Sequence, residues 1–134
     1  HIGYRQTALA LGELIVRVRL PLPAAGALQR FTKVGTRQAQ AISKVSLAFA
    51  ARREGAVLRQ VRFAAGSVAA TPVRLPSAEA VCEGVTLSAD LAEVAGRAAA
   101  GDVTPLDDVR STAAYRRFVL ARCVRRMVLD AAQG

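Results

Sequence analysis

Aromatic residues are few in this sequence, which has four phenylalanines, two tyrosines and no tryptophan in 134 residues. Hydrophobic residues nevertheless make up 52% of the chain, so a core must be built mainly from small aliphatic side chains. Few aromatics also disfavour a surface on which nucleic-acid bases stack. No apolar run reaches the ~18 residues of a membrane span, and the first residues lack the pattern of an export signal. We therefore expect a cytoplasmic protein with no membrane partner.

Residues that carry catalysis or bind metals are equally sparse. The only histidine is His1, and the two cysteines, Cys82 and Cys123, have no CxxC partner and no nearby histidine. We therefore predict no metal site and two buried free thiols, as expected in a reducing cytosol. The GxSxG, HExxH, GxGxxG and Walker patterns are absent, so no catalytic residue is assigned. The adjacent carboxylates Asp107 and Asp108 are expected to serve the start of a helix.

Positive charge is what the chain has in excess, with 19 lysines and arginines against 10 acidic residues and a net charge of +9. The arginines are scattered over many segments, which favours a basic face toward another protein over sequence-specific nucleic-acid binding. Only Lys33 and Lys44 are lysines. Lysine is a compact point charge whereas arginine is a wide planar fork. The choice of lysine at position 33 therefore indicates that the group beside it leaves room for a small cation but not for a guanidinium.

The first two thirds of the chain carry patterns typical of antiparallel strands, in which apolar and polar residues alternate. Gly55 separates two of these segments and predicts a β-hairpin. Residues 71–76 are expected to cross in an extended form, because Pro72 and Pro76 oppose a helix. The four segments expected to form strands are 13–21, 27–34, 44–52 and 57–66.

The last third of the chain has helical patterns. Ser77 and Ser88 are expected to cap two short helices, and residues 111–131 form a longer amphipathic one. Tyr115 and Val119 fall among the arginines of the last helix, either as part of a solvated face or as a contact with a neighbouring domain or subunit. The fold class that follows is α+β, with an antiparallel sheet of about four strands in the N-terminal two thirds backed by about three helices.

Four segments carry short motifs that are modest singly and specific as an ordered set. They are GYRQTALALGELIVRVRLP (3–21), FTKVGTRQAQAISKVSLA (31–48), VRFAAGSVAATPVRLPSAEAVCEG (61–84) and DDVRSTAAYRRFVLARCVRR (107–126). In this order they resemble the C-terminal domain of the FAD-binding subunit of the molybdenum hydroxylases, the xanthine dehydrogenase and carbon monoxide dehydrogenase flavoprotein family.

The resemblance implies an organisation and a function. Residues 1–12 would be the tail of a preceding FAD-binding domain, and residues 13–134 the C-terminal α+β domain of the same subunit. FAD would be shared with that upstream domain, while the molybdenum cofactor and the iron–sulfur clusters would lie in partner subunits. The domain would then take part in a xanthine dehydrogenase-like enzyme, where electrons pass from the clusters through FAD to an acceptor, and the isolated chain would be inactive.

The family also implies site residues, because the lysine of its Phe-x-Lys motif and the segment after it lie against the isoalloxazine edge. Carried over, these positions are Lys33, Arg37 and Ile42. A compact ammonium can approach the edge of a reduced flavin and stabilise its negative charge. Gln40 and Ala41 stand where animal members have an acidic pair, which leaves a role in NAD handling open.

Two alternatives stay beside this interpretation. Lys33 could be a solvated lysine that protects an edge strand from aggregation. The whole chain could be a basic α+β module that binds an acidic protein or nucleic acid without flavin chemistry.

Overall fold

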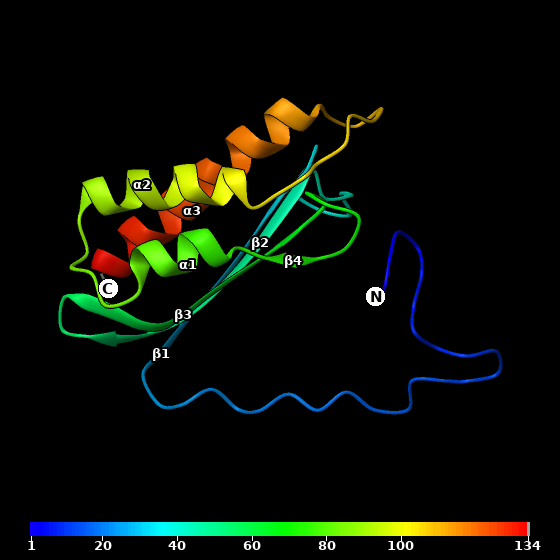
Figure 1. Cartoon of the computed structure of the whole chain (residues 1–134), viewed down its shortest axis with the longest axis horizontal. Helices are drawn as coiled ribbons and strands as arrows, with labels where there is room; N and C mark the ends of the chain where they lie inside the picture. Colours follow the sequence, from blue (N-terminus) through cyan, green and yellow to red (C-terminus); the bar gives the residue numbers. More distant parts are fainter. Residues whose placement is uncertain (134) are drawn as a thin grey trace.

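An antiparallel sheet of four strands, covered on one face by three helices, forms this structure (Figure 1). It is a computed structural model that describes residues 1–133. The strands lie in the order of the sequence: β1 (Ala27–Val34), β2 (Val45–Glu54), β3 (Val57–Gly66) and β4 (Val73–Arg74). The helices follow as α1 (Pro76–Cys82), α2 (Ala89–Gly101) and α3 (Ala113–Gln133). The predicted α+β fold is confirmed.

The hairpin of β2 and β3 supplies the inner face of the sheet. Gly55 takes a φ of 61° in its turn, a conformation that glycine adopts without strain. Alternate residues of β2 are buried against the helices, and Phe49 stacks on Phe63 of β3 with 4.9 Å between ring centroids. The predicted hairpin is confirmed.

Small residues let the helices approach one another closely, as the alanine-rich composition predicts. A Cβ placed on Gly96 of α2 would lie 2.7 Å from the carbonyl oxygen of Ala121 in α3. Ala92, Ala95 and Ala99 are buried on the same helix. The core is therefore close-packed from short side chains.

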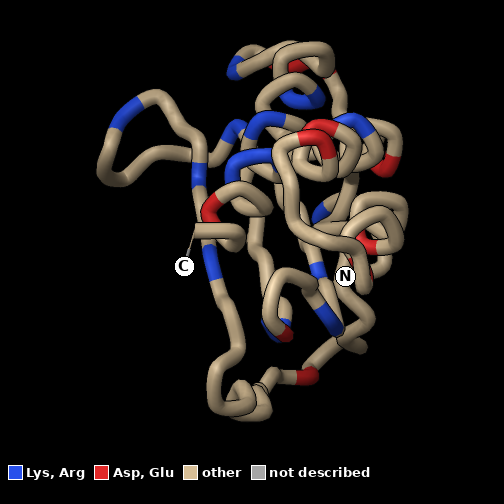
Figure 2. Tube along the Cα trace, turned by 90° about the vertical axis from the view of Figure 1, so that its left-hand side faces the viewer, with Lys and Arg blue, Asp and Glu red and all other residues tan. Residues whose placement is uncertain are grey.

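Positive residues are spread over strands, helices and loops rather than gathered in one patch of the described chain in the view of Figure 2. Several are paired with carboxylates within their own neighbourhood. Arg74 lies 2.6 Å from Glu79, and Arg126 lies 2.8 Å from Asp130. The net charge of +9 thus does not form a continuous phosphate-binding face in this view.

The predicted strand over residues 13–21 is wrong for this structure. These residues are extended but pair with no strand among residues 1–133, and the side chain of Val16 is 91% exposed. A half-buried strand requires a neighbour that accepts its hydrogen bonds and covers its apolar face, and the sequence pattern does not say where that neighbour is. The fourth strand is instead Val73–Arg74, which lies in the extended segment predicted over residues 71–76. This strand pairs with β3.

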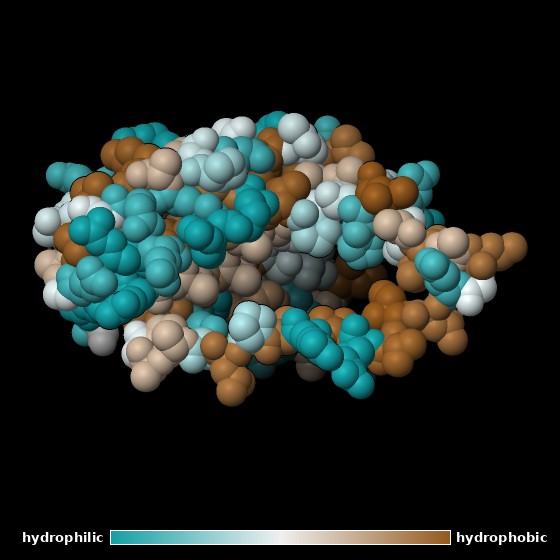
Figure 3. Space-filling model, turned by 60° about the horizontal axis from the view of Figure 1, so that its bottom comes forward, coloured by the Kyte–Doolittle hydropathy of each residue, from teal (hydrophilic) through white to brown (hydrophobic). Residues whose placement is uncertain are grey.

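The extended N-terminal segment, residues 13–26, runs along the side of the sheet that has no helices (Figure 1). Apolar side chains gather on the N-terminal part of the chain toward the right and lower edge of Figure 3. A hollow separates this part from the rest of the molecule in the same view. Two surfaces, the segment and the outer sheet face, are therefore left exposed and opposite each other.

One helix start differs from the prediction and one agrees with it. Helix α1 begins at Pro76 with Leu75 at its N-cap, so Ser77 is not the cap. Instead Asp102, at the end of α2, accepts bonds from the backbone N–H (3.0 Å) and hydroxyl (2.6 Å) of Ser77. Ser88 caps α2 as predicted, because its hydroxyl accepts a bond from the N–H of Leu91 at 3.0 Å.

Both cysteines are free, as predicted, with Cys82 buried and Cys123 half-buried. Burial raises the pKa of the Cys82 thiol to about 11. Among residues 1–133, no three histidine, cysteine or acidic side chains are grouped to hold a metal ion. None of the helices in that same range combines the length and apolarity needed to traverse a bilayer.

Candidate functional site

The connection between β1 and β2, residues 35–43, is a loop pinned by hydrogen bonds to its own backbone. At its base the N–H of Lys44 donates to the carbonyl of Val34 at 2.8 Å. The ammonium of Lys33 donates to the carbonyl of Ala41 at 3.0 Å. Lysine is suited to this contact because a single compact cation reaches back to one carbonyl oxygen.

The β1–β2 loop is also tightly folded. A Cβ on Gly35 would lie only 2.6 Å from the Cβ of Ala41, so a larger residue at position 35 would displace the loop. Gln40 has a φ of 51°, and the guanidinium of Arg37 donates to its carbonyl at 2.9 Å. The conformation therefore depends on a glycine and on two cation–carbonyl bonds.

Arg37 and Ile42 both line a cavity of about 360 Å³ beside this loop. The side chain of Ile42 is 63% exposed, and Val109 and Arg110 form the opposite wall. Lys33 does not line this cavity, but its ammonium binds the residue before Ile42. The structure thus places the three predicted site residues around one loop.

A second cavity, of about 320 Å³, lies on the other side of Ile42. Ser67, Asp108 and Arg116 contribute polar groups to it, and Arg110 lines both cavities. Ile42 and Arg110 therefore stand between two hollows that open to solvent beside the loop.

Arg116 is buried, with only 5% of its surface exposed, and it joins three loops. One guanidinium nitrogen donates to the carbonyls of Lys44 and Ser67, both at 2.8 Å. The other donates to a carboxylate oxygen of Asp108 at 2.8 Å. Its Nε has no hydrogen-bond partner within the described chain. The end of the β1–β2 loop is thus fixed to the segment after β3 and to the segment before α3.

Asp108 accepts three hydrogen bonds and is more than a helix-start residue. Its carboxylate accepts from the backbone N–H groups of Arg110 and Ser111 at 2.9 Å each, and from Arg116. The bond from Arg110 and then those from Ser111 and Arg116 lower the pKa of Asp108. Asp107 does serve the helix, because it accepts from the N–H of Ala113 at 2.5 Å.

Sequence reasoning missed the role of Arg116, although the signal was present. The ending DDVRSTAAYRR contains Asp108, Arg110, Ser111 and Arg116, the residues that form this cluster. Helical periodicity does not show that an arginine on the last helix turns inward to meet two carbonyls from distant loops. Only the spatial arrangement brings those acceptors together.

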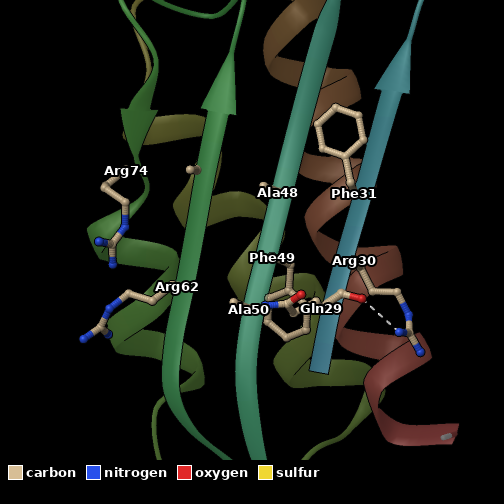
Figure 4. A pocket seen from close by; sticks show the side chains of 9 residues that line it. Gln29, Arg30, Phe31, Ala48, Phe49, Ala50, Arg62 and Arg74 are labelled. Carbon is tan, nitrogen blue, oxygen red and sulfur yellow. Dashed lines mark hydrogen bonds between the residues drawn. The ribbon is translucent and has the colours of Figure 1, made fainter. Parts of the chain in front are cut away.

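The outer face of the sheet carries a further shallow cavity of about 480 Å³ (Figure 4). Its floor is made of Ala48, Ala50 and Ala64, and Phe31 stands at one side with Arg62 and Arg74 at the other. Such a floor is flat and apolar, since alanine side chains project little from a pleated sheet.

Lys33 belongs to the next row of this outer face. In the register of the sheet it pairs with Ser46, which in turn pairs with Gly66. A Cβ on Gly66 would lie 2.6 Å from the hydroxyl oxygen of Ser46, so only glycine fits there and the row projects little from the sheet at these two positions. The ammonium of Lys33 therefore borders an open part of the sheet as well as the β1–β2 loop.

The family model of the CO dehydrogenase flavoprotein C-terminal domain matches residues 30–131. The chain belongs to this family. This match confirms the resemblance predicted from the sequence motifs. The prediction that the chain is a C-terminal domain of a flavoprotein subunit is confirmed.

Relatives of the CO dehydrogenase flavoprotein family agree in sequence and in fold. The medium subunit of nicotine 6-hydroxylase from Paenarthrobacter nicotinovorans is 30% identical over 131 residues, which cover 97% of this chain and 45% of that subunit. The carbon monoxide dehydrogenase of Hydrogenophaga pseudoflava, in a form that lacks the Mo-pyranopterin moiety, matches with a TM-score of 0.89 at 29% identity. That match covers 98% of this chain and 45% of the other.

Quinoline 2-oxidoreductase from Pseudomonas putida 86 has a TM-score of 0.88 at 26% identity, covering 99% of this chain and 46% of its own. The chain therefore spans about half the length of the relatives that it matches.

Proposed function

We propose that this domain completes the flavin site in the FAD subunit of a molybdenum hydroxylase. The observation that supports this most directly is that Arg37 and Ile42 lie on one loop beside an open cavity and that Lys33, at the end of β1, binds the same loop. These are the positions that the family resemblance assigns to the edge of the isoalloxazine ring.

The residues present fit one edge of a flavin and not a whole dinucleotide. An ammonium has three donors, and Lys33 uses one of them on Ala41, so two remain on an exposed side chain. The short side chain of Ser46 and the absence of one at Gly66 leave space on the sheet next to the Lys33 ammonium. Glycine-rich phosphate loops are absent from the sequence, so the phosphates and the adenosine would be held by the upstream half of the subunit.

When bound, FAD supplies a relay that accepts electrons from iron–sulfur clusters and delivers them to an acceptor. Within this chain, Lys33 would stabilise negative charge at the ring edge, and Ile42 would exclude water from it. Arg37 would present a positive charge to the cavity in which an acceptor approaches.

The same proposal assigns partners. The molybdenum cofactor and the iron–sulfur clusters would lie in partner subunits, and residues 1–12 would end a preceding FAD-binding domain. The exposed apolar residues of segment 13–21 would pack against that domain. The substrate would be chosen at the molybdenum subunit. A xanthine dehydrogenase-like enzyme remains our proposal, while the relatives are named for nicotine, carbon monoxide and quinoline.

Substitution of Lys33 by methionine in the complete subunit tests the proposal. Loss of a partly exposed cation near the ring should cost the reduced form about 1–2 kcal/mol, which lowers a two-electron midpoint potential by roughly 20–40 mV. The measurement is a spectroelectrochemical titration of the bound flavin.

Arg97→Met is the matched control, because it removes an exposed positive charge on α2, away from the cavities beside the β1–β2 loop. Lys33→Arg keeps the charge and enlarges the group, and should recover only part of the shift. An unchanged potential in Lys33→Met, or an equal shift in Arg97→Met, would remove Lys33 from the flavin site.

A further inference from the structure

A groove of about 380 Å³ runs between strand β1, at the edge of the sheet, and helix α3. We call it the β1–α3 groove. It lies apart from the β1–β2 loop and none of its residues lines the cavities on either side of Ile42. The residues that matter for its chemistry are Arg30, Phe31, Phe118, Arg122, Arg126 and Asp130.

Two of the four phenylalanines of the chain border this groove, Phe31 from the outer face of the sheet and Phe118 from α3. Phe31 is 68% exposed and Phe118 is 64% exposed, whereas Phe49 and Phe63 are stacked in the core. A chain with so few aromatic residues gains no stability from leaving half of its phenylalanines in water. Exposed aromatics of this kind are typical of the centre of a protein–protein contact.

Positive charge surrounds the two rings. Arg126 is paired with Asp130 at 2.8 Å, and Arg30 donates only to the carbonyl of its neighbour Gln29. Arg122 has neither a hydrogen bond nor an ion pair with any residue from 1 to 133. Three arginines therefore face one carboxylate, which leaves the groove complementary to acidic groups.

The open edge of β1 adds backbone groups to the groove. β1 pairs only with β2, so the N–H and C=O groups on its other side have no strand partner in the described sheet. An extended peptide can pair with such an edge and place alternate side chains in adjacent pockets.

We propose that the β1–α3 groove binds an extended acidic segment of a partner protein, which adds to the sheet at β1. Alternate side chains of the segment pack on Phe31 at the outer face of the sheet and on Phe118 of α3, and flanking carboxylates pair with Arg30 and Arg122. A second copy of this chain does not fit, because pairing two β1 edges would bring the same arginines together on molecules that each carry a net charge of +9. The proposal does not depend on flavin binding.

Photo-cross-linking tests directly which segment binds the β1–α3 groove. p-Benzoyl-phenylalanine replaces Phe118 in the complete subunit, isolated with the proteins that accompany it, and mass spectrometry identifies the cross-linked peptide. The same residue at Val94, which is exposed on α2 outside the groove, is the control. We expect cross-links at position 118 to a peptide rich in aspartate or glutamate, and none of that peptide at position 94.

Charge reversal then tests the recognition. Arg122→Glu should lower the yield of that cross-link about tenfold, as expected for loss of a desolvated charge pair. Arg97→Glu, an equal change at an exposed site on α2, should leave the yield unchanged. Both variants should keep their thermal midpoint, because exposed substitutions seldom alter stability by more than ~0.5 kcal/mol. The absence of a specific cross-link, a cross-link to nucleic acid or a second copy, or an equal yield in Arg122→Glu would each overturn the proposal.

Discussion

The guanidinium of Arg116 and the carboxylate of Asp108 lie 2.8 Å apart and connect the last helix to the loop that precedes it. Arg116 also holds the carbonyl of Lys44, at the end of the β1–β2 loop. The geometry of the candidate site thus depends on a residue that contacts neither Lys33 nor Arg37. Arg116 is a positioning residue, because it acts through the backbone that it fixes.

Replacement of Arg116 by leucine should destabilise the domain. Two part-buried carbonyls and one carboxylate would lose their donors, and we expect a loss of about 3 kcal/mol in the free energy of unfolding, measured with urea. Arg117→Leu is the control, since Arg117 is exposed on the same helix and should change stability by less than ~0.5 kcal/mol. Equal losses in both variants would contradict the role assigned to Arg116.

Protonation of Asp108 should contribute to the loss of unfolding free energy in acid. Its pKa is lowered in the folded state by the hydrogen bonds from Arg110, Ser111 and Arg116. A group whose folded pKa is lowered contributes stability above its unfolded pKa, about 3.9 for aspartate, and that contribution is lost as pH falls through the folded value. Asp108→Asn should therefore flatten the decrease of unfolding free energy below about pH 4. Asp90→Asn, which removes an exposed carboxylate on α2, is the comparison, and an unchanged acid profile in Asp108→Asn would refute the assignment.

Gly35→Ala should displace the β1–β2 loop. The new Cβ would meet the Cβ of Ala41 at 2.6 Å, and overpacking of this kind costs about 1–3 kcal/mol. Thermal unfolding measures the loss, and Gly101→Ala is the control because a Cβ there meets nothing within 4 Å. The double variant Gly35→Ala/Ala41→Gly removes the clash and should regain most of the stability. Without such recovery, contact with Ala41 would not be the reason for a glycine at position 35.

Val16→Asp tests where the N-terminal segment packs. In this structure Val16 is exposed, so the variant of the present chain should unfold like the unchanged one. In the complete subunit, where we propose that segment 13–21 packs on the upstream domain, an aspartate should cost about 2–3 kcal/mol because a charge replaces buried apolar surface. Arg17→Asp is the neighbour control, since adjacent residues of an extended segment face opposite sides. Equal stability of the two complete subunits would exclude this packing.

The sequence pattern predicted those elements whose partners lie nearby in the chain. The β2–β3 hairpin and the start of α2 rest on Gly55 and Ser88, which act within a few residues of their own position. The cap of α1 could not be predicted in this way, because Asp102 is 25 residues from Ser77. The prediction of a strand over residues 13–21 failed for a related reason. Their alternation of apolar and polar residues is typical of a strand but does not show which strand would pair with it.

The amino-acid sequence by itself determined the family, the α+β class and the position of Arg37 and Ile42 in the segment after Lys33, because motifs and periodicity are local properties of the chain. The tertiary structure alone decided that Lys33 pins Ala41, that Arg116 ties three loops together, and that Phe31 and Phe118 share a groove. Each of these contacts joins residues that no helical or strand period relates. They form only when burial of the small-residue core brings distant segments within hydrogen-bonding distance.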